Sequence, residues 1–297
     1  IFQMTFFIIT PALMVGAFVE RIKFSAMLWF TGLWALLVYV PACHTVWGGG
    51  IFGEMGVQDF AGGIVVHITA GVGALVACIV LGPRKGYPDT QMMPHNLPMT
   101  VAGTGMLWVG WFGFNGGSQL AAGTFEDVGS VATIFINTNL AACAGVMACA
   151  AISRLVTGKT DVIMMLNGAL GGLVAITAEP LAPSPILAIT IGAIGGVLVF
   201  YGTTLLFKLK IDDVVGAIPV HGFAGIFGTL AVPLSNSDAS FVIQVYGILW
   251  VNIFVFVVAI ILWYLMKITF GIRISENAEK LGTDKSEVGV IAYSIRD

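Results

Sequence analysis

The chain has 297 residues, of which 58% are hydrophobic and 10% are charged, and its formal net charge at pH 7 is −3. Soluble domains carry roughly 25% charged residues, so this composition excludes an ordinary soluble protein. The absence of a concentrated basic patch also excludes nucleic acid as a partner.

Nine apolar stretches follow one another along the chain, separated by polar or turn-rich links. They are residues 1–19, 24–47, 60–81, 98–115, 129–156, 162–178, 185–207, 214–234 and 241–270. Each is close to the length that crosses a bilayer, so the sequence predicts an all-α polytopic membrane protein. The transmembrane domain is predicted over residues 1–270, and the polar segment 271–297 is predicted to be a tail.

The distribution of charge supports this division into helices. All 13 Lys and Arg residues fall in alternate links, at the ends of the stretches beside them or in the tail, on one side of the predicted membrane. The links on the other side carry acidic residues: Glu54, Asp59, Glu126, Asp127, Glu179 and Asp238. Because Lys and Arg concentrate in cytoplasmic loops, we expect a multi-pass protein of the cell (plasma) membrane. The C-terminus is then cytoplasmic and Ile1 lies outside.

Two predicted helices carry a histidine in the same short context. Segments Val66–Gly71 and Val220–Gly225 share the pattern Val-His-x-x-Ala-Gly, which contains His67 and His221. They belong to the third and eighth stretches, so the two helices cross the membrane in opposite directions. This arrangement predicts an inverted-topology repeat, which places transport sites near the midplane.

Both histidines lie well inside the predicted hydrocarbon region, where an unpartnered polar group costs several kcal/mol. Two interpretations remain open for His67 and His221. The imidazoles could hydrogen-bond to each other and relay a proton. Alternatively, each could bond to a backbone carbonyl and be purely structural.

The sequence offers no pattern for catalysis or for a bound cofactor. The four cysteines have no paired metal-ligand spacing, and no nucleophile–base motif is present. Glycine-rich runs such as "GALGGLVA" predict close helix packing in a membrane rather than a phosphate loop. We therefore predict a protein that is not an enzyme and has no catalytic residues, no metal site and no cofactor.

Six motifs, spread over nearly the whole chain, resemble those of the ammonium transporter (Amt/Mep/Rh) family. They are "ITPALMVGAFVERIKFSA", "HTVWGGG", "DFAGGIVVHITAG", "PHNLP", "WFGFNGGS" and "VHGFAGIFGTL". The resemblance implies an Amt-type inverted repeat and a homotrimer with a separate pore in each subunit. Family members usually have eleven helices, so nine transmembrane helices are expected here, with the first two absent from this fragment.

The resemblance also implies roles along the pore. His67 and His221 match the twin pore histidines, and Phe6 and Phe114 match a stacked phenyl gate above them. Carrying a full charge through an apolar constriction is costly, whereas NH₃ is small and neutral. The implied mechanism is deprotonation of NH₄⁺ at the gate, followed by conduction of NH₃ past the histidines.

Above the gate, Phe2, Trp47 and Ser118 match the outer ammonium site of the family. An aromatic cluster with a hydroxyl suits NH₄⁺, which cation–π contact holds by roughly 0.5–2 kcal/mol. Without the resemblance, Phe2 and Trp47 would also fit an interfacial aromatic belt. Asp59 matches the acidic residue at the outer start of the His67 helix, where it could cap the helix or stabilise the arriving cation.

Two places depart from the family pattern. Many members have a further Asp three residues beyond the pair Asp212 and Asp213, where this chain has Gly216. In the tail, Val288 and Val290 stand where the family has His and Glu. In the family this face and the tail dock a PII-type signalling protein, and the departures weaken that expectation here.

Two hypotheses about function follow. The first is transport, with ammonium or ammonia as the substrate and membrane lipids as the surroundings. The second is an ammonium sensor that uses the same fold to signal to a fused or associated cytoplasmic domain. Sequence beyond Asp297 would discriminate between them.

Overall fold

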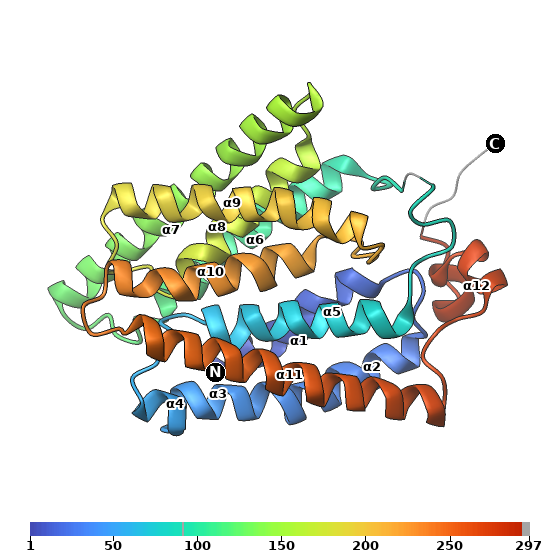
Figure 1. The fold of residues 1–297 in the computed structure, drawn as a ribbon, viewed down its shortest axis with the longest axis horizontal. Helices are drawn as coiled ribbons and strands as arrows, with labels where there is room; N and C mark the ends of the chain where they lie inside the picture. The colour runs from blue at the N-terminus through green and yellow to red at the C-terminus, as the bar shows by residue number, and fades with distance from the viewer. Residues whose placement is uncertain (91, 293–297) are drawn as a thin grey trace.

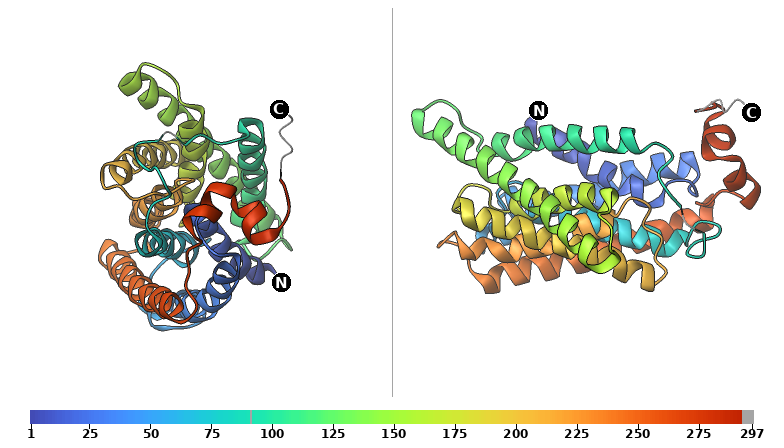
Figure 2. Two further views of the ribbon diagram at one scale, coloured as in Figure 1. Left: turned by 90° about the vertical axis from the view of Figure 1, so that its right-hand side faces the viewer. Right: turned by 90° about the horizontal axis from the view of Figure 1, so that it is seen from above.

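The computed structural model describes residues 1–90 and 92–292. Within these ranges the regular secondary structure is helical, apart from one isolated β-bridge. The long helices lie side by side in a bundle, and the short C-terminal helices lie at one end of it (Figures 1 and 2). The prediction of an all-α fold is therefore confirmed.

The first part of the chain supplies three helical spans. Its elements are α1 (Phe2–Phe18), α2 (Phe24–Trp34), η1 (Ala35–Tyr39), α3 (Val40–Trp47), α4 (Ile51–Glu54), η2 (Gly63–Ile68) and α5 (Thr69–Leu81). Elements α2, η1 and α3 form one continuous helix, as do η2 and α5.

The rest of the chain supplies six further spans and the tail. Its elements are α6 (Leu97–Gly117), α7 (Phe125–Thr157), α8 (Val162–Thr177), α9 (Pro185–Lys208), η3 (Ile218–Phe223), α10 (Ala224–Ala231), η4 (Val232–Leu234), α11 (Phe241–Thr269), α12 (Glu276–Leu281) and η5 (Asp284–Val288). Each of the nine predicted stretches thus corresponds to a helical span.

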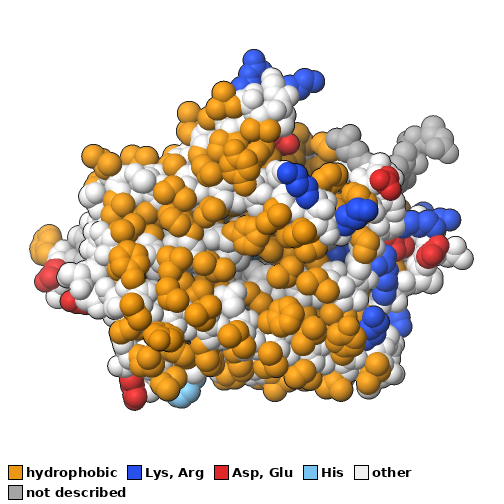
Figure 3. All heavy atoms as spheres, viewed as in Figure 1, with side chains coloured by type: hydrophobic (Ala, Val, Ile, Leu, Met, Phe, Trp, Pro, Cys, Tyr) orange, Lys and Arg blue, Asp and Glu red, His pale blue; other side chains and the backbone are white. Residues whose placement is uncertain are grey.

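Length and composition agree with a membrane setting. Within the described residues, five helical segments are long and apolar enough to cross a bilayer: Phe24–Glu54, Gly63–Leu81, Phe125–Thr157, Pro185–Lys208 and Phe241–Thr269. Large apolar side chains cover much of the surface over the bundle (Figure 3). Lys and Arg side chains gather at its right-hand end and at the upper tip (Figure 3).

Two ends of the bundle are distinguished by charge. Among the described residues, the basic end comprises the links 19–23, 82–90, 92–96, 158–161 and 209–217 together with residues 270–292 of the tail. The acidic end comprises the links 48–62, 118–124, 178–184 and 235–240.

Polar residues in the links determine where helices begin. Thr124 and Asp127 form a capping box at the start of α7, since the Asp127 amide donates to the Thr124 hydroxyl and the Thr124 amide donates to the Asp127 carboxylate. This cap starts α7 four residues before the predicted stretch at 129. Asp161 caps α8 by accepting the Met164 amide at 3.1 Å.

Close packing of α7, α8 and α9 depends on glycine. A Cβ atom at Gly145 would meet the carbonyl oxygen of Gly168, and one at Gly196 would lie 2.5 Å from the carbonyl oxygen of Gly145. The backbones therefore touch where the side chains are smallest, as expected for glycine in membrane helices.

Candidate functional site

Two buried helices that enter the bundle from opposite ends bring the histidines together. They are η2–α5, which carries His67, and η3–α10, which carries His221. A Cβ at Gly71 would meet the backbone of Gly222, and one at Gly225 would lie 3.2 Å from the His67 Cβ. Because no side chain separates the helices at this crossing, the two imidazole centroids lie 5.2 Å apart.

Asp59 caps the helix that carries His67. One of its carboxylate oxygens accepts the amides of Gly62 and Gly63 at 2.9 and 2.6 Å. The other accepts the amides of Ile64 and Val65, both at 2.9 Å. These four donors are groups that a helix start leaves unpaired. Burial raises the pKa of the Asp59 carboxyl to about 6, because it outweighs the four amide hydrogens that lower it.

Asp213 caps the helix that carries His221 in the same way. This role was not predicted from the sequence. Its carboxylate accepts the amides of Gly216 and Ala217 at 3.1 Å and that of Ile218 at 2.7 Å. Each capping aspartate stands eight residues before its histidine. Extending the repeat alignment upstream by seven residues, from Val66 and Val220, would have found it.

Each capped start contains a glycine with positive φ, Gly62 at 111° and Gly216 at 80°. The chain then enters a π-helical turn that contains the histidine, η2 in one half and η3 in the other. Such wide turns occur frequently at functional sites. The helices begin at 63 and 218 rather than at the predicted 60 and 214, because the aspartate loops precede them.

Packing, rather than hydrogen bonding, determines how the His67 ring is oriented. His67 is fully buried, and its ring lies nearly parallel to those of His221, Trp111 and Phe114. Among residues 1–90 and 92–292, no hydrogen-bond partner is found for either ring nitrogen of His67 or for Nδ1 of His221. The hydrogen bond between imidazoles considered above is therefore not formed, and neither is a bond from His67 to a backbone carbonyl.

A line of aromatic rings leads from the acidic end to His67. The Phe2 and Phe6 centroids are 5.0 Å apart, those of Phe6 and Phe114 are 4.4 Å apart, and those of Phe114 and His67 are 5.6 Å apart. Trp47 meets Phe6 edge-on at 5.8 Å. Phe6 is almost completely buried, so its ring and that of Phe114 close the space between them.

Trp47 and Ser118 are tied to the same region. The Trp47 indole N–H donates to the Asp59 carbonyl oxygen at 2.7 Å, which links this ring to the start of the His67 helix. The Ser118 hydroxyl donates to the Phe114 carbonyl oxygen at 2.8 Å. Its proton is committed to that bond, so the oxygen presents its lone pairs to other donors. Gly117, beside Ser118, lies against the Phe2 ring.

Trp111 belongs to this constellation and was missed in the sequence. It lies one turn before Phe114 on α6, and its ring lies 5.2 Å from that of His67 with 19° between the planes. The spacing of three residues, which places two side chains on one helix face, was the available signal.

A second set of charged contacts lies at the basic end, beside Asp213. Asp212 accepts from the Arg84 amide at 2.8 Å and from two guanidinium nitrogens at 2.9 and 3.0 Å. Buried Arg21 donates to the Asp212 carbonyl oxygen at 2.7 Å. Burial by itself raises the pKa of the Asp212 carboxyl, but its bonds to Arg84 outweigh burial and lower the pKa below its ordinary value.

Next to these contacts a cavity of about 500 Å³ reaches the start of η3. Its lining includes Tyr87, Thr203, Asp212 and Pro219, which stands two residues before His221. The cavity thus lies at the basic end, beside the start of the helix that carries His221.

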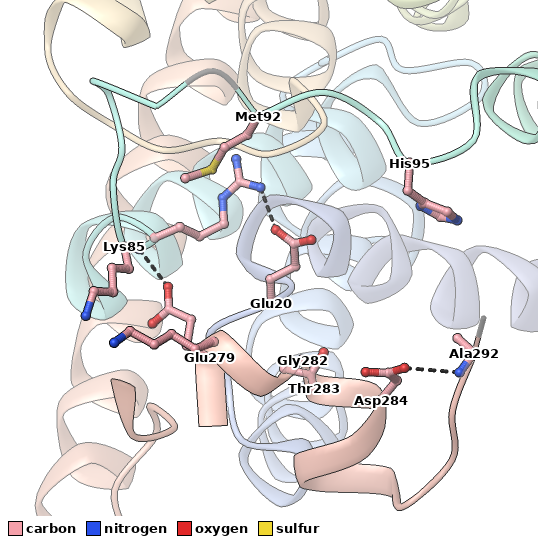
Figure 4. Close-up of a pocket in the computed structure, with 11 residues that line it drawn as sticks. Glu20, Lys85, Met92, His95, Glu279, Gly282, Thr283, Asp284 and Ala292 are labelled. Atoms are coloured by element: carbon pink, nitrogen blue, oxygen red, sulfur yellow. Dashed lines mark hydrogen bonds and ion pairs between the residues drawn. The ribbon is translucent and has the colours of Figure 1, made fainter. Parts of the chain in front are cut away.

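The tail packs onto the basic end. A β-bridge joins Ile22 to Arg273, and the Phe24 amide at the start of α2 donates to Glu287 at 2.9 Å. A larger cavity of about 840 Å³ lies between the tail and the links (Figure 4). Charges of both signs line it: Arg84 pairs with Glu20, and the Glu279 carboxylate accepts the backbone amide of Lys85.

Comparison with known proteins agrees with this arrangement. The model of the Ammonium Transporter Family matches residues 1–293. An ammonium transporter of Bacillus subtilis is 42% identical over 308 residues, covering 98% of this chain and 74% of the relative. Ammonium transporter Amt1 of Archaeoglobus fulgidus is 34% identical over 306 residues, covering 99% of this chain and 77% of the relative.

Solved structures are similar as well. A structure described as Sensor Amt Protein has a TM-score of 0.91 and 31% sequence identity, covering 96% of this chain and 75% of that one. The crystal structure of Candida albicans Mep2 has a TM-score of 0.85 and 29% identity, covering 93% of this chain and 65% of that one.

Proposed function

This chain belongs to the ammonium transporter family, and on that premise we propose that it conducts ammonia taken from ammonium across the membrane, along the line of rings that ends at His67 and His221. The observation that carries the proposal is this line itself. It is continuous from Phe2 to the histidine pair; Phe6, His67 and His221 are buried, and Phe114 is half-buried.

The cation binds first, at an outer site formed by Phe2, Trp47 and Ser118. The two aromatic rings supply cation–π contact, and the Ser118 oxygen accepts a hydrogen bond from NH₄⁺. Asp59 supports the site indirectly, since it holds both the Trp47 ring and the start of the His67 helix. The site selects a cation and binds it weakly enough for release.

The phenyl pair Phe6 and Phe114 then favours deprotonation of the bound NH₄⁺. Their centroids are 4.4 Å apart, so a hydrated cation cannot pass without displacing the rings. Moving a bare charge into this apolar setting costs at least about 2.5–3.5 kcal/mol. Neutral NH₃ avoids that cost, so the barrier falls when NH₄⁺ gives its proton to water on the outer side of the gate and NH₃ enters.

Beyond the gate, the histidine nitrogens receive NH₃. The nitrogens of His67 have no protein partner among the described residues, which supports their availability to the substrate. A neutral imidazole can donate from one nitrogen and accept at the other. The pair can therefore replace the hydration that NH₃ loses.

Orientation and assembly are proposals of the same kind. By the positive-inside rule, the basic end and the tail face the cytoplasm and the outer site faces the opposite side. We also propose that the protein assembles as a homotrimer. The sensing alternative is not adopted, because no observation on the described residues favours it over transport.

The test is ammonium-driven transport by the protein reconstituted in proteoliposomes. Current is recorded on a supported membrane after an ammonium pulse, and a trapped pH dye detects any uncharged flux. We expect a saturable signal, a half-saturating concentration raised by Trp47→Ala, and a large loss with His67→Ala. Trp29→Ala is the matched control, because Trp29 is exposed on the outer surface of the bundle. A brief charge displacement that is independent of liposome size, with no change in internal pH, would mean binding without transport.

A further inference from the structure

We propose that Thr177 is a positioning residue of the pore, because its hydroxyl fixes the Trp111 ring that covers one face of His67. This inference rests on the function proposed above, and it concerns the orientation of the His67 imidazole.

The orientation of the His67 ring depends on the rings packed around it. Since neither of its nitrogens has a hydrogen-bond partner among the described residues, its ring is oriented by the rings around it. Of its two neighbours other than His221, Trp111 lies more nearly parallel to the His67 ring than Phe114 does. The Trp111 and His67 planes differ by 19°, and their centroids are 5.2 Å apart. Rotation of the Trp111 indole would therefore release the imidazole on that face.

Thr177 is what holds Trp111. The Trp111 indole N–H donates to the Thr177 hydroxyl at 2.9 Å, and both residues are buried. The Thr177 hydroxyl donates its own proton to the Leu173 carbonyl oxygen at 2.7 Å. With its proton committed to the helix, the hydroxyl presents its lone pairs toward the indole, which gives the bond a fixed direction.

The same residue also holds the chain that leads into the His67 helix. The Ala61 amide donates to the Thr177 carbonyl oxygen at 3.2 Å, and the Phe60 amide donates to that of Ala178 at 2.8 Å. The end of α8 thus fixes two things at once: the start of the η2 turn through the backbone, and the Trp111 ring through the hydroxyl.

The two functions of Thr177 can be separated experimentally. Thr177→Val keeps the shape and the carbonyl but removes the acceptor, leaving the indole N–H unpaired in a dry site. Thr177→Ser restores a hydroxyl. Because the indole then loses the bond that fixes its orientation, we expect Thr177→Val to lower the maximal transport rate about tenfold and Thr177→Ser to recover most of it. The half-saturating ammonium concentration should not change, since the outer site is not touched.

A double-mutant cycle with Trp111→Phe gives the decisive readout. If Thr177 acts through the indole N–H, Thr177→Val adds nothing to Trp111→Phe, which already lacks that group. Thr104→Val is the matched control, because the buried Thr104 hydroxyl bonds only to its own helix at the Thr100 carbonyl oxygen. It should leave transport unchanged.

Three outcomes overturn the inference: wild-type rates in Thr177→Val, no rescue by Thr177→Ser, or losses that multiply in the double variant. Should Thr177→Val not fold, Thr177→Ala takes its place in the cycle, with folded protein quantified by gel filtration. A wild-type protein without any ammonium flux would instead refute the proposed function, so the two failures are distinguishable.

Discussion

The two halves of the repeat, Asp59–Gly71 and Asp213–Gly225, are built alike and are surrounded differently. Both read Asp-x-x-Gly-x-Ile-x-Val-His-x-x-Ala-Gly. In both, the aspartate caps the helix, the first glycine takes a positive φ, the histidine lies in a π-helical turn and the last glycine lies at the helix crossing. The shared residues are therefore those that place a buried histidine.

The surroundings differ in chemistry. The Asp59 carboxylate bonds to backbone amides, and its histidine lies among aromatic rings. Asp213 instead follows Asp212, which two arginines hold at the basic end. The comparison indicates that the repeat places the histidines, whereas residues outside it set the chemistry around each of them.

Removing the capping aspartates should have the largest effect. Asp59→Ala leaves four amides without their acceptor and Asp213→Ala leaves three. Because each unpaired buried donor costs about 1–3 kcal/mol, both variants should be severely destabilised, and Asp59→Ala by about 1 kcal/mol more. Thermal unfolding of the purified protein in detergent measures this. A greater loss for Asp213→Ala would show that the halves are not built alike.

The second prediction concerns the Arg84–Asp212 ion pair at the basic end. Arg84→Met removes the nearer of the two arginine partners of Asp212, whose side chain is 1% exposed, and should cost up to about 3–5 kcal/mol at neutral pH. Because the folded-state pKa of Asp212 is lowered, the stability from the pair is present above the ordinary value near 4 and lost as pH falls through the lowered pKa.

The difference in unfolding temperature between wild type and Arg84→Met should therefore be largest at pH 7 and shrink below pH 4. Lys85→Met is the control, since the Lys85–Glu276 pair is exposed and should contribute little to stability. A difference that is constant with pH would mean that Arg84 stabilises the protein by packing alone.

The sequence was sufficient for the helical spans and for the histidine pair. Hydropathy records which segments avoid water, and a histidine in an apolar run stands out by its chemistry. It was not sufficient for Trp111, because an aromatic residue in an apolar helix resembles every other core residue until its neighbours are known.

Contacts between distant parts of the chain were equally hidden. Arg84 and Asp212 lie 128 positions apart, and Phe24 and Glu287 lie 263 apart. Pairing over such distances depends on how the helices pack, which hydropathy does not report. Asp213 differs from these, since the repeat pattern contained it and a longer alignment was enough.

A smaller effect is expected at the two glycines with positive φ. Alanine costs about 1–2 kcal/mol in the left-handed region, and Gly62 at 111° lies farther from the well near 57° than Gly216 at 80°. A Cβ at Gly62 would also lie 2.7 Å from a Val66 methyl carbon. Gly62→Ala should thus destabilise more than Gly216→Ala in the same unfolding assay. Equal losses would indicate that contacts, rather than φ, decide the cost.

The smallest effect is expected in the tail, which bonds to residues at the basic end, among them Phe24 and Leu81. Glu287→Ala removes the acceptor of the Phe24 amide, and loss of such a cap on an exposed helix start costs about 0.5–2 kcal/mol. The bond holds the tail rather than the bundle, so limited proteolysis within the tail should accelerate several-fold while the unfolding temperature stays the same. Glu276→Ala, which breaks an exposed pair with Lys85, should accelerate it less. A fall in the maximal transport rate at an unchanged unfolding temperature would mean that the tail acts on the His221 half of the pore. The two halves of the repeat would then differ in how they are controlled as well as in what surrounds them.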